Sequence, residues 1–303
     1  MARRKKGRKI SGWINLDKPY ELGSTPAVSR VRWLFHAQKA GHAGTLDPLA
    51  TGVLPIALGE ATKTVSFMQE AAKTYRVSIG LGVATTTDDI EGEPLETSPH
   101  RPETQEIKAA LASFIGDIEQ VPPQFSAIRK DGVRAYTKAR AGELVELEAR
   151  RVRIDHIRFL RRVDEDHFTL EVDCGKGVYI RSLARDLAAQ LGTRGHVTKL
   201  RRTRVGPFEE KSALGLDKLT NLGHSAPDLA ALDACLLPLT TALDDIPAVA
   251  ISGDEASRIK QGQAISPQGL AVMGPVLLTH EQLPVAIAHQ DGETLKPMRV
   301  FNL

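Results

Sequence analysis

The stretch GHAGTLDPLATGVLPIALG, residues 41–59, combines a glycine-containing loop, one carboxylate and an apolar run. Pro48 biases the preceding Asp47 toward an extended backbone, and the glycines before it permit a tight loop that a ligand can approach closely. Residues 53–59 are apolar, which predicts a short buried strand, and Pro55 restricts such a strand to a sheet edge or a bulge. The stretch therefore predicts a lone acid displayed beside a buried strand.

Length and composition indicate a globular protein. The chain has 303 residues, of which 42% are hydrophobic and 25% charged, enough for one large domain with a small appendage or for two ordinary domains. Its uncharged apolar stretches, such as 53–59 and 269–278, are far shorter than the roughly 20 residues of a membrane helix. The basic start, MARRKKGRKI, is not followed by the apolar core of a signal peptide. We expect no membrane segment and no export.

The cysteines and histidines give no sign of a metal site. Cys174 and Cys235 stand far apart without companions, which argues against a thiolate zinc site and a disulfide framework and fits a reducing cytoplasm. The nine histidines show neither HxxxH nor HExxH spacing. We therefore expect a cytoplasmic protein that needs no metal and no cofactor.

Positive charge is unevenly distributed along the chain. Net charge is +3, but residues 238–303 carry four basic and seven acidic side chains, so the first 237 residues carry +6. Basic clusters lie at 3–9, 129–140 and 199–204. Because Lys and Arg that neutralise phosphates release condensed counterions, a polyanion is the expected partner, although solvated surface charge explains any single cluster.

Strand and helix patterns place further candidates near turns. Residues 168–174 alternate in polarity as a strand does, and a GKG turn and a helix from Ile180 to Gly192 follow. Tyr179 and Arg181 therefore stand beside a turn, a common position for site residues. Residues 120–143 hold two prolines and five basic residues, which predicts an exposed excursion from the core.

Other segments also have patterns that predict local structure. Trp13 to Leu16 predicts a strand, and Thr25 followed by proline predicts the N-cap of a helix. Residues 196–208 predict a strand with one charged face, and 238–247 predict a linker. The apolar runs AVAI, LAVM, PVLL and PVAIA that follow predict a small β-rich module.

Several motifs together resemble the TruB family of tRNA pseudouridine synthases. They are GHAGTLDPLATGVLPIALGEATK (41–63), KTYR (73–76) and GVYIRSL (177–183), with LDKP (16–19), a TxTxDxxG pattern at 85–92, and FSAI with AYTKAR around 125–140. The resemblance covers about residues 11–210. It implies isomerisation of uridine-55 in the T-loop of tRNA to pseudouridine, in which the base is flipped out, detached, rotated and rejoined through carbon.

The resemblance also assigns catalytic roles. Asp47 is similar to the family's essential carboxylate, acting as nucleophile or as acid and base. Tyr75 resembles the ring that stacks on the flipped base and helps to remove the C5 proton. Arg181 resembles the ion-pair partner of Asp47 and is expected to lower the pKa of that carboxylate and keep it charged.

Four further residues resemble the family's base-binding and RNA-binding positions. His42 is similar to the residue that fills the gap left by the flipped nucleotide. Tyr179 and Leu200 resemble pocket walls, and Lys18 resembles a lysine that supports the pocket. Asp89 also matches a family position, but an acid in a polar loop can simply cap a turn, so we leave it out of the catalytic set.

The implied fold is α+β, with a mixed, mainly antiparallel sheet and flanking helices, as in pseudouridine synthases. We expect a basic disordered tail at 1–10, a catalytic domain at 11–237 and a small β-rich, PUA-like RNA-binding module at 245–303. An insertion at about 120–150 resembles the thumb that closes on the T-arm of tRNA, where its basic residues would meet phosphates. We expect a monomer with tRNA as partner, without an obligatory protein partner.

Other interpretations stay open. From local sequence alone Asp47 is a turn residue before proline, Tyr75 and Tyr179 are core aromatics, and Lys18 and Arg181 are surface charges. A catalytic subunit that depends on a guide RNA shares these motifs. A third possibility is a chaperone that binds and refolds tRNA without needing Asp47.

Overall fold

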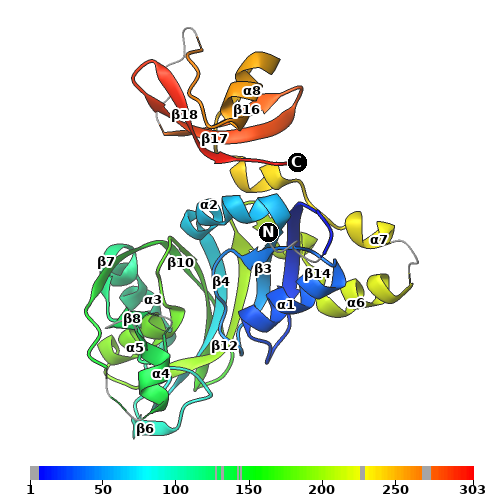
Figure 1. Cartoon of the computed structure of the whole chain (residues 1–303). Helices are drawn as coiled ribbons and strands as arrows, with labels where there is room; N and C mark the ends of the chain where they lie inside the picture. The colour runs from blue at the N-terminus through cyan, green and yellow to red at the C-terminus, as the bar shows by residue number, and fades with distance from the viewer. Residues whose placement is uncertain are drawn as a thin grey trace.

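The computed structural model describes residues 7–126, 128–130, 133–141, 143, 145–225, 229–267 and 274–303. Within these ranges a ten-stranded sheet forms the body, and a four-stranded sheet lies above it in Figure 1. Helices pack around the large sheet, whose pairings are antiparallel except at β1 with β14 and β3 with β12. The expected α+β fold with a mixed, mainly antiparallel sheet is confirmed.

The large sheet has the order β14-β1-β3-β12-β4-β11-β10-β7, with β2 beside β3 and β13 beside β12. Its strands are β1 (Gly12–Lys18), β2 (Ala40–His42), β3 (Thr51–Leu58), β4 (Lys73–Leu81), β7 (Gly116–Gln120), β10 (Arg150–Arg162), β11 (His167–Cys174), β12 (Gly195–Val205), β13 (Phe208–Glu209) and β14 (Leu214–Gly215). Two small hairpins are β5 (Val83–Thr85) with β6 (Pro94–Thr97) and β8 (Arg129–Lys130) with β9 (Val133–Arg134).

The helices of the body are short. They are α1 (Ser24–Leu34), α2 (Val65–Glu70), α3 (Thr104–Ala110), α4 (Ala135–Arg140), α5 (Ile180–Gln190), α6 (Leu216–Ser225) and α7 (Ala230–Asp233). Four 3₁₀ helices accompany them: η1 (Gly59–Thr64), η2 (Leu111–Phe114), η3 (Glu210–Ser212) and η4 (Leu239–Leu243). None of the helices that the structure describes is long and apolar enough to cross a membrane.

Helix α5 shows how sequence pattern positions an element beside the site. Ile180, Leu183 and Leu187 recur at helical spacing and are buried in one core with residues of α1, β3, β4 and β11. The helix ends before Gly192, whose φ of +72° suits glycine, as the sequence predicts. Strand β11, the GKG turn and α5 therefore place Tyr179 and Arg181 over the middle of the sheet.

Strand β3 is internal, which corrects the expectation of an edge or a bulge at Pro55. On one side β3 pairs with β1 throughout, and on the other β12 pairs with Thr51 and Gly52 while β2 pairs with 56–58. Pro55 lies between these two short pairings, where its missing N–H is tolerated.

Two further expectations of local structure were wrong. Helix α1 begins at Ser24, with Gly23 as its N-cap, because the Ser24 hydroxyl bonds to Leu46 and Thr25 already lies in the first turn. Residues 238–247 are not an open linker, since η4 buries Leu239, Ala242 and Leu243 in a second core with Trp13. Burial of its apolar residues fixes this segment against the sheet.

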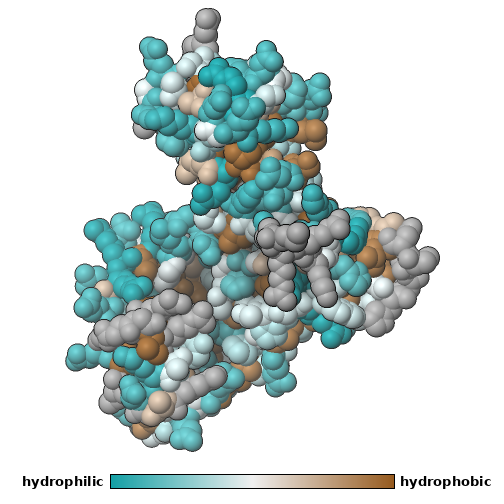
Figure 2. Space-filling model, in the orientation of Figure 1, coloured by the Kyte–Doolittle hydropathy of each residue, from teal (hydrophilic) through white to brown (hydrophobic). Residues whose placement is uncertain are grey.

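The C-terminal sheet joins that second core. Its elements are β15 (Ala248–Ala250), α8 (Gly253–Lys260), β16 (Pro275–His280), β17 (Leu283–Asp291) and β18 (Thr294–Val300); the LAVM run lies outside the described residues. Phe301 is buried with Trp13 and η4, while Lys63 Nζ donates to the Val300 carbonyl at 2.6 Å. Figure 2 shows apolar side chains on the side of this module that faces the body.

Candidate functional site

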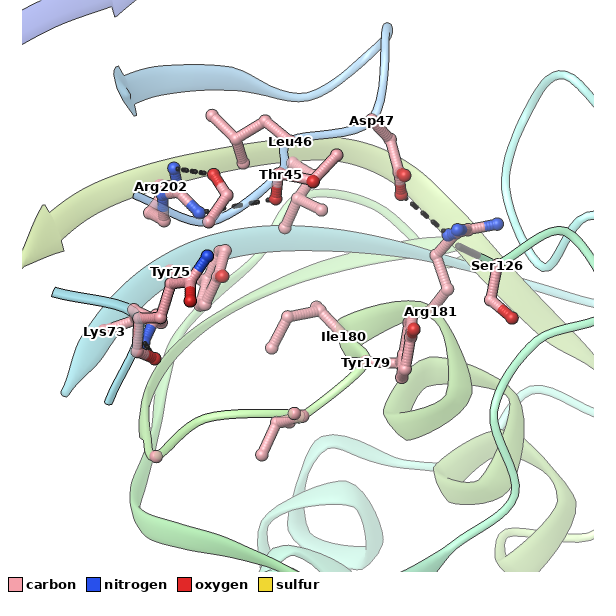
Figure 3. A pocket seen from close by; sticks show the side chains of 16 residues that line it. Thr45, Leu46, Asp47, Lys73, Tyr75, Ser126, Tyr179, Ile180, Arg181 and Arg202 are labelled. Atoms are coloured by element: carbon pink, nitrogen blue, oxygen red, sulfur yellow. Dashed lines mark hydrogen bonds and ion pairs between the residues drawn. The ribbon is translucent and has the colours of Figure 1, made fainter. Parts of the chain in front are cut away.

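A cleft of about 270 Å³ opens between the loop that follows β2, the strands β4 and β12, and the start of α5. Among its lining residues are Gly44, Thr45, Leu46, Asp47, Lys73, Tyr75, Ser126, Tyr179, Arg181, Leu200 and Arg202. Figure 3 shows Asp47 and Arg181 meeting on one side of the cleft, with Tyr75 and Arg202 on the other. Five of the seven predicted site residues therefore line one cleft.

Arg181 connects three segments at the cleft. Its Nε lies 3.0 Å from Asp47 Oδ2, and its side chain is only 5% exposed. Its other nitrogens donate to the Thr87 and Phe125 carbonyls, both at 2.9 Å, and one lies 3.6 Å from Asp89 Oδ2. The ion pair expected between Arg181 and Asp47 is thus present in the structure, and Asp89 faces the same guanidinium.

The pKa of Asp47 is raised overall by burial, although Arg181 lowers it as the resemblance implies. Its side chain keeps 41% exposure toward the cleft, but protein surrounds it on the other sides. This burial raises the pKa of Asp47, and the Arg181 charge opposes the rise without cancelling it. Asp89, on the far side of Arg181, adds to the rise.

Buried side chains hold the backbone around Asp47. Arg202 donates to the Gly44 carbonyl at 3.1 Å and approaches that of Thr45 at 3.5 Å. The Ser24 hydroxyl donates to Leu46 O at 2.9 Å and accepts from Leu46 N at 2.8 Å. Lys18 Nζ donates to Pro48 O at 3.0 Å. The carbonyls on both sides of Asp47 are therefore occupied, and its side chain projects into the cleft.

Lys18 and His42 do not line the cleft. Lys18 is fully buried and also donates to the Pro19 and Leu22 carbonyls, and this burial lowers its pKa to about 8. His42 ends β2, and burial lowers its pKa as well. Its Nδ1 has no hydrogen-bond partner in the described part of the chain. Lys18 thus supports the loop of Asp47 through its bond to the Pro48 carbonyl. His42 lies five residues before Asp47 in the sequence.

Tyr75, Tyr179 and Leu200 form the walls of the cleft. Tyr75 on β4 is 8% exposed, and burial raises the pKa of its phenol, a rise that the Arg202 charge opposes. Tyr179 caps α5, and its backbone N–H donates to Gln120 Oε1 at 2.8 Å. Leu200, on β12, pairs with Val77 of β4. Two aromatic rings and an aliphatic side chain provide walls suited to a flat ring.

Sequence reasoning missed Arg202 and Ser24. The sequence places Arg202 in a basic cluster expected to meet a polyanion, yet this residue is 1% exposed. Two arginines on the opposite face of β12 also have protein partners: Arg201 pairs with Asp17 and Glu210, and Arg204 Nε donates to Thr74. Alternation could have found the error, because adjacent strand residues point to opposite faces and one of Arg201 and Arg202 must point inward.

The two other basic clusters are described only in part. In the insertion, the side chains of Arg129, Lys130, Arg134 and Arg140 lie outside the described residues. At the start of the chain residues 1–6 lie outside them too, while Arg8 pairs with Asp233 and its N–H donates to His36 O. Residues 7–10, expected within a disordered tail, thus contact the body.

The arrangement suits proton transfer or nucleophilic attack by a carboxylate on a flat substrate. In the described part of the chain Asp47 Oδ2 has Arg181 as its partner, and Oδ1 has none. One oxygen is therefore available to a ligand while the other is held. No group of three or more His, Cys, Asp or Glu side chains that could hold a metal occurs in the described ranges.

Three protein-family models match the chain in succession. TruB family pseudouridylate synthase (N terminal domain) matches residues 32–180, and tRNA pseudouridylate synthase B C-terminal domain matches 181–244. Pseudouridine synthase II TruB, C-terminal matches 247–301. The matched segments follow one another along most of the chain.

Curated relatives are similar over their whole length. The tRNA pseudouridine synthase B of Caulobacter sp. (strain K31) is 53% identical over 313 residues, covering 100% of both chains. That of Dinoroseobacter shibae (strain DSM 16493 / NCIMB 14021 / DFL 12) is 56% identical over 303 residues, covering 99% of this chain and 98% of the relative. A chain in the crystal structure of a Cbf5-Nop10-Gar1 complex is 25% identical with a TM-score of 0.73, covering 96% of this chain and 85% of that one.

Proposed function

Because the chain belongs to the TruB family of pseudouridine synthases, we propose that it converts uridine-55 in the T-loop of tRNA to pseudouridine. The observation that carries this proposal is the Asp47 carboxylate, held 3.0 Å from Arg181 in a cleft that Tyr75 also lines. The curated relatives named tRNA pseudouridine synthase B support tRNA as the substrate.

The reaction requires the base to leave the RNA stack. A base inside folded RNA is inaccessible, so the enzyme flips it into the cleft at a cost of a few kcal/mol. Tyr75 stacks on the flipped uracil, with Tyr179 and Leu200 as the other walls. His42, which lies outside the cleft at the end of β2, fills the gap in the RNA.

Asp47 then acts on the glycosidic bond, as nucleophile or as acid and base. The bond from N1 to C1′ breaks, the base rotates, and a bond from C5 to C1′ forms. C5 gives up a proton and N1 gains one, so the isomerisation is balanced without a co-reactant. Tyr75 helps to remove the C5 proton, and Arg181 keeps Asp47 ionised against the burial that raises its pKa.

We further propose that the enzyme works as a cytoplasmic monomer without cofactor, guide RNA or protein partner. The catalytic part is 11–237, the insertion at about 120–150 grips the T-arm, and 245–303 is an RNA-binding module. Binding through Lys and Arg then weakens steeply with salt, because counterions are released from the phosphates.

One assay tests the proposal. Purified protein is incubated with unmodified tRNA transcript, and pseudouridine is mapped for wild type and for Asp47→Asn, with a transcript that carries cytidine at position 55 as control. Product is expected at position 55 with wild type alone. Absence of product from wild type contradicts the proposal. Equal product from Asp47→Asn shows that the Asp47 carboxylate is not needed in the mechanism.

The same assay separates two rival functions. A guide-dependent subunit shares these motifs, and a chain of the Cbf5-Nop10-Gar1 complex resembles this fold at 25% identity, against 53–56% for the relatives named tRNA pseudouridine synthase B. Product formed without any guide RNA contradicts it. A tRNA chaperone predicts that Asp47→Asn still binds and refolds tRNA, an activity that can coexist with isomerisation.

A further inference from the structure

Arg202 is a buried cation without an acidic partner. It is 1% exposed, and in the described part of the chain no carboxylate lies within ion-pair distance of its guanidinium. Its guanidinium donates to three backbone carbonyls, Val53 O at 2.8 Å from Nε, Gly44 O at 3.1 Å and Thr45 O at 3.5 Å, and the Tyr75 hydroxyl is a further hydrogen-bond partner. A buried charge that is held by carbonyls, with no carboxylate to neutralise it, is destabilising, so its position calls for an explanation beyond stability.

The adjacent Arg201 shows the ordinary arrangement. It lies on the opposite face of β12 with 28% of its side chain exposed, and it pairs with Asp17 and Glu210. The two arginines share a strand, a charge and a length. They differ in that Arg201 is bound to carboxylates at the surface, whereas Arg202 is bound to the loop that carries Asp47.

The backbone of Arg202 also lies between β4, which carries Tyr75, and β3, which follows the loop of Asp47. It pairs with Tyr75 of β4 on one side and with Gly52 of β3 on the other. A Cβ on Gly52 would lie 2.2 Å from the Arg202 carbonyl oxygen, so only glycine permits this approach. One residue thus fixes the strand of Tyr75 through its backbone and the loop of Asp47 through its side chain (Figure 3).

We propose that Arg202 is the positioning residue that sets the location of Asp47 relative to Tyr75. It acts through the Gly44 and Thr45 carbonyls and makes no bond to substrate. This inference rests on the proposed function, because it concerns the geometry of that reaction. The planar guanidinium donates from separate nitrogens at fixed angles, whereas a lysine such as Lys18 donates to its carbonyls from one nitrogen.

The test compares Arg202→Met and Arg202→Lys with the matched control Arg201→Met. We measure the single-turnover rate of pseudouridine formation, the Kd for tRNA and the midpoint of thermal unfolding. For Arg202→Met we expect the rate to fall about 100-fold, as for a catalytic group displaced by about 1 Å, with an unchanged Kd. Arg202→Lys should recover part of the rate because it keeps the charge, and Arg201→Met should match wild type.

Hydrogen–deuterium exchange without tRNA gives a readout that is independent of activity. Peptides that cover residues 43–54 should exchange faster in Arg202→Met and Arg202→Lys than in wild type, and Arg201→Met should leave them unchanged. If Arg202→Met does not fold, Arg202→Lys carries the test. A full rate in Arg202→Lys with unchanged exchange, or a loss of rate matched by Arg201→Met, overturns the proposal. An inactive wild type instead refutes the proposed function.

Discussion

Two loops deliver a carboxylate to Arg181, and they are built differently. The Asp89 carboxylate makes hydrogen bonds within its own loop: it accepts from the Thr87 hydroxyl and from Glu91 N at 3.1 Å. Its side chain is 11% exposed. The loop of Asp47 is held from outside by Arg202, Ser24 and Lys18, and its carboxylate is 41% exposed. Asp89 therefore stabilises its own turn, whereas Asp47 is left open to a ligand.

The largest expected effect is on the rate of the Asp47 variant, in which Asp47 and Asp89 should differ most. Asp47→Asn should lower the single-turnover rate by about 10³-fold or more, since it removes the group that acts on substrate. The free energy of unfolding should not fall by more than about 0.5 kcal/mol, because an amide avoids the desolvation that raises the Asp47 pKa. Urea unfolding and rate measurements check both. A rate within tenfold of wild type would place the chemistry elsewhere.

Arg181→Met removes the partner that both loops share. Without the guanidinium, the already raised pKa of Asp47 should rise further, because a nearby positive charge favours the ionised form. A carboxylate with a higher pKa is protonated at higher pH, so activity should be lost earlier as pH falls. Rates measured from pH 5 to 9 test this. An acid limb that coincides with that of wild type would contradict the ion-pair role.

Asp89→Asn should lower stability more than rate, the opposite of what we expect for Asp47→Asn. Its loss weakens the bonds to Thr87 and Glu91, so we expect the free energy of unfolding to fall by about 1–2 kcal/mol. The rate should fall by no more than about tenfold, as for a residue that acts through Arg181. Equal rate losses in Asp47→Asn and Asp89→Asn would remove the distinction between the two loops.

Ser24→Ala gives the smallest expected effect. It leaves the Leu46 N–H and carbonyl without their partner, which should cost about 1–2 kcal/mol of unfolding free energy and lower the rate only a few-fold. Ser29→Ala on the same helix is a matched control. A rate unchanged within error would show that Arg202 and Lys18 suffice to hold the loop.

Much of the architecture follows from local pattern and family motifs. Alternation at 168–174 and the helical spacing from Ile180 predict β11 and α5, and the motif resemblance identifies the family that the family models and relatives confirm. The roles of the seven site residues stay predictions. The pairing of Asp47 with Arg181 depends on the fold, because 133 residues separate them in the sequence.

What could not be predicted shares a physical cause. Arg202 and Ser24 act on backbone carbonyls and N–H groups, and every residue carries these, so no side-chain pattern reveals which ones are reached. The raised pKa of Asp47 depends on how much protein surrounds the carboxylate, which a motif does not encode. The internal position of Pro55 is not predictable from its own strand, because two short pairings, with β12 and with β2, share one side of β3.

The close approach at Gly52 has a consequence for anyone who wishes to redesign the pocket. Its φ of +101°, and the Arg202 carbonyl oxygen only 2.2 Å from where a Cβ would lie, close this position to every other amino acid. Leu200 and Tyr179 line the cleft with their side chains. A mutant library for altered nucleobases should therefore vary 179 and 200 and leave 52 and 202 fixed.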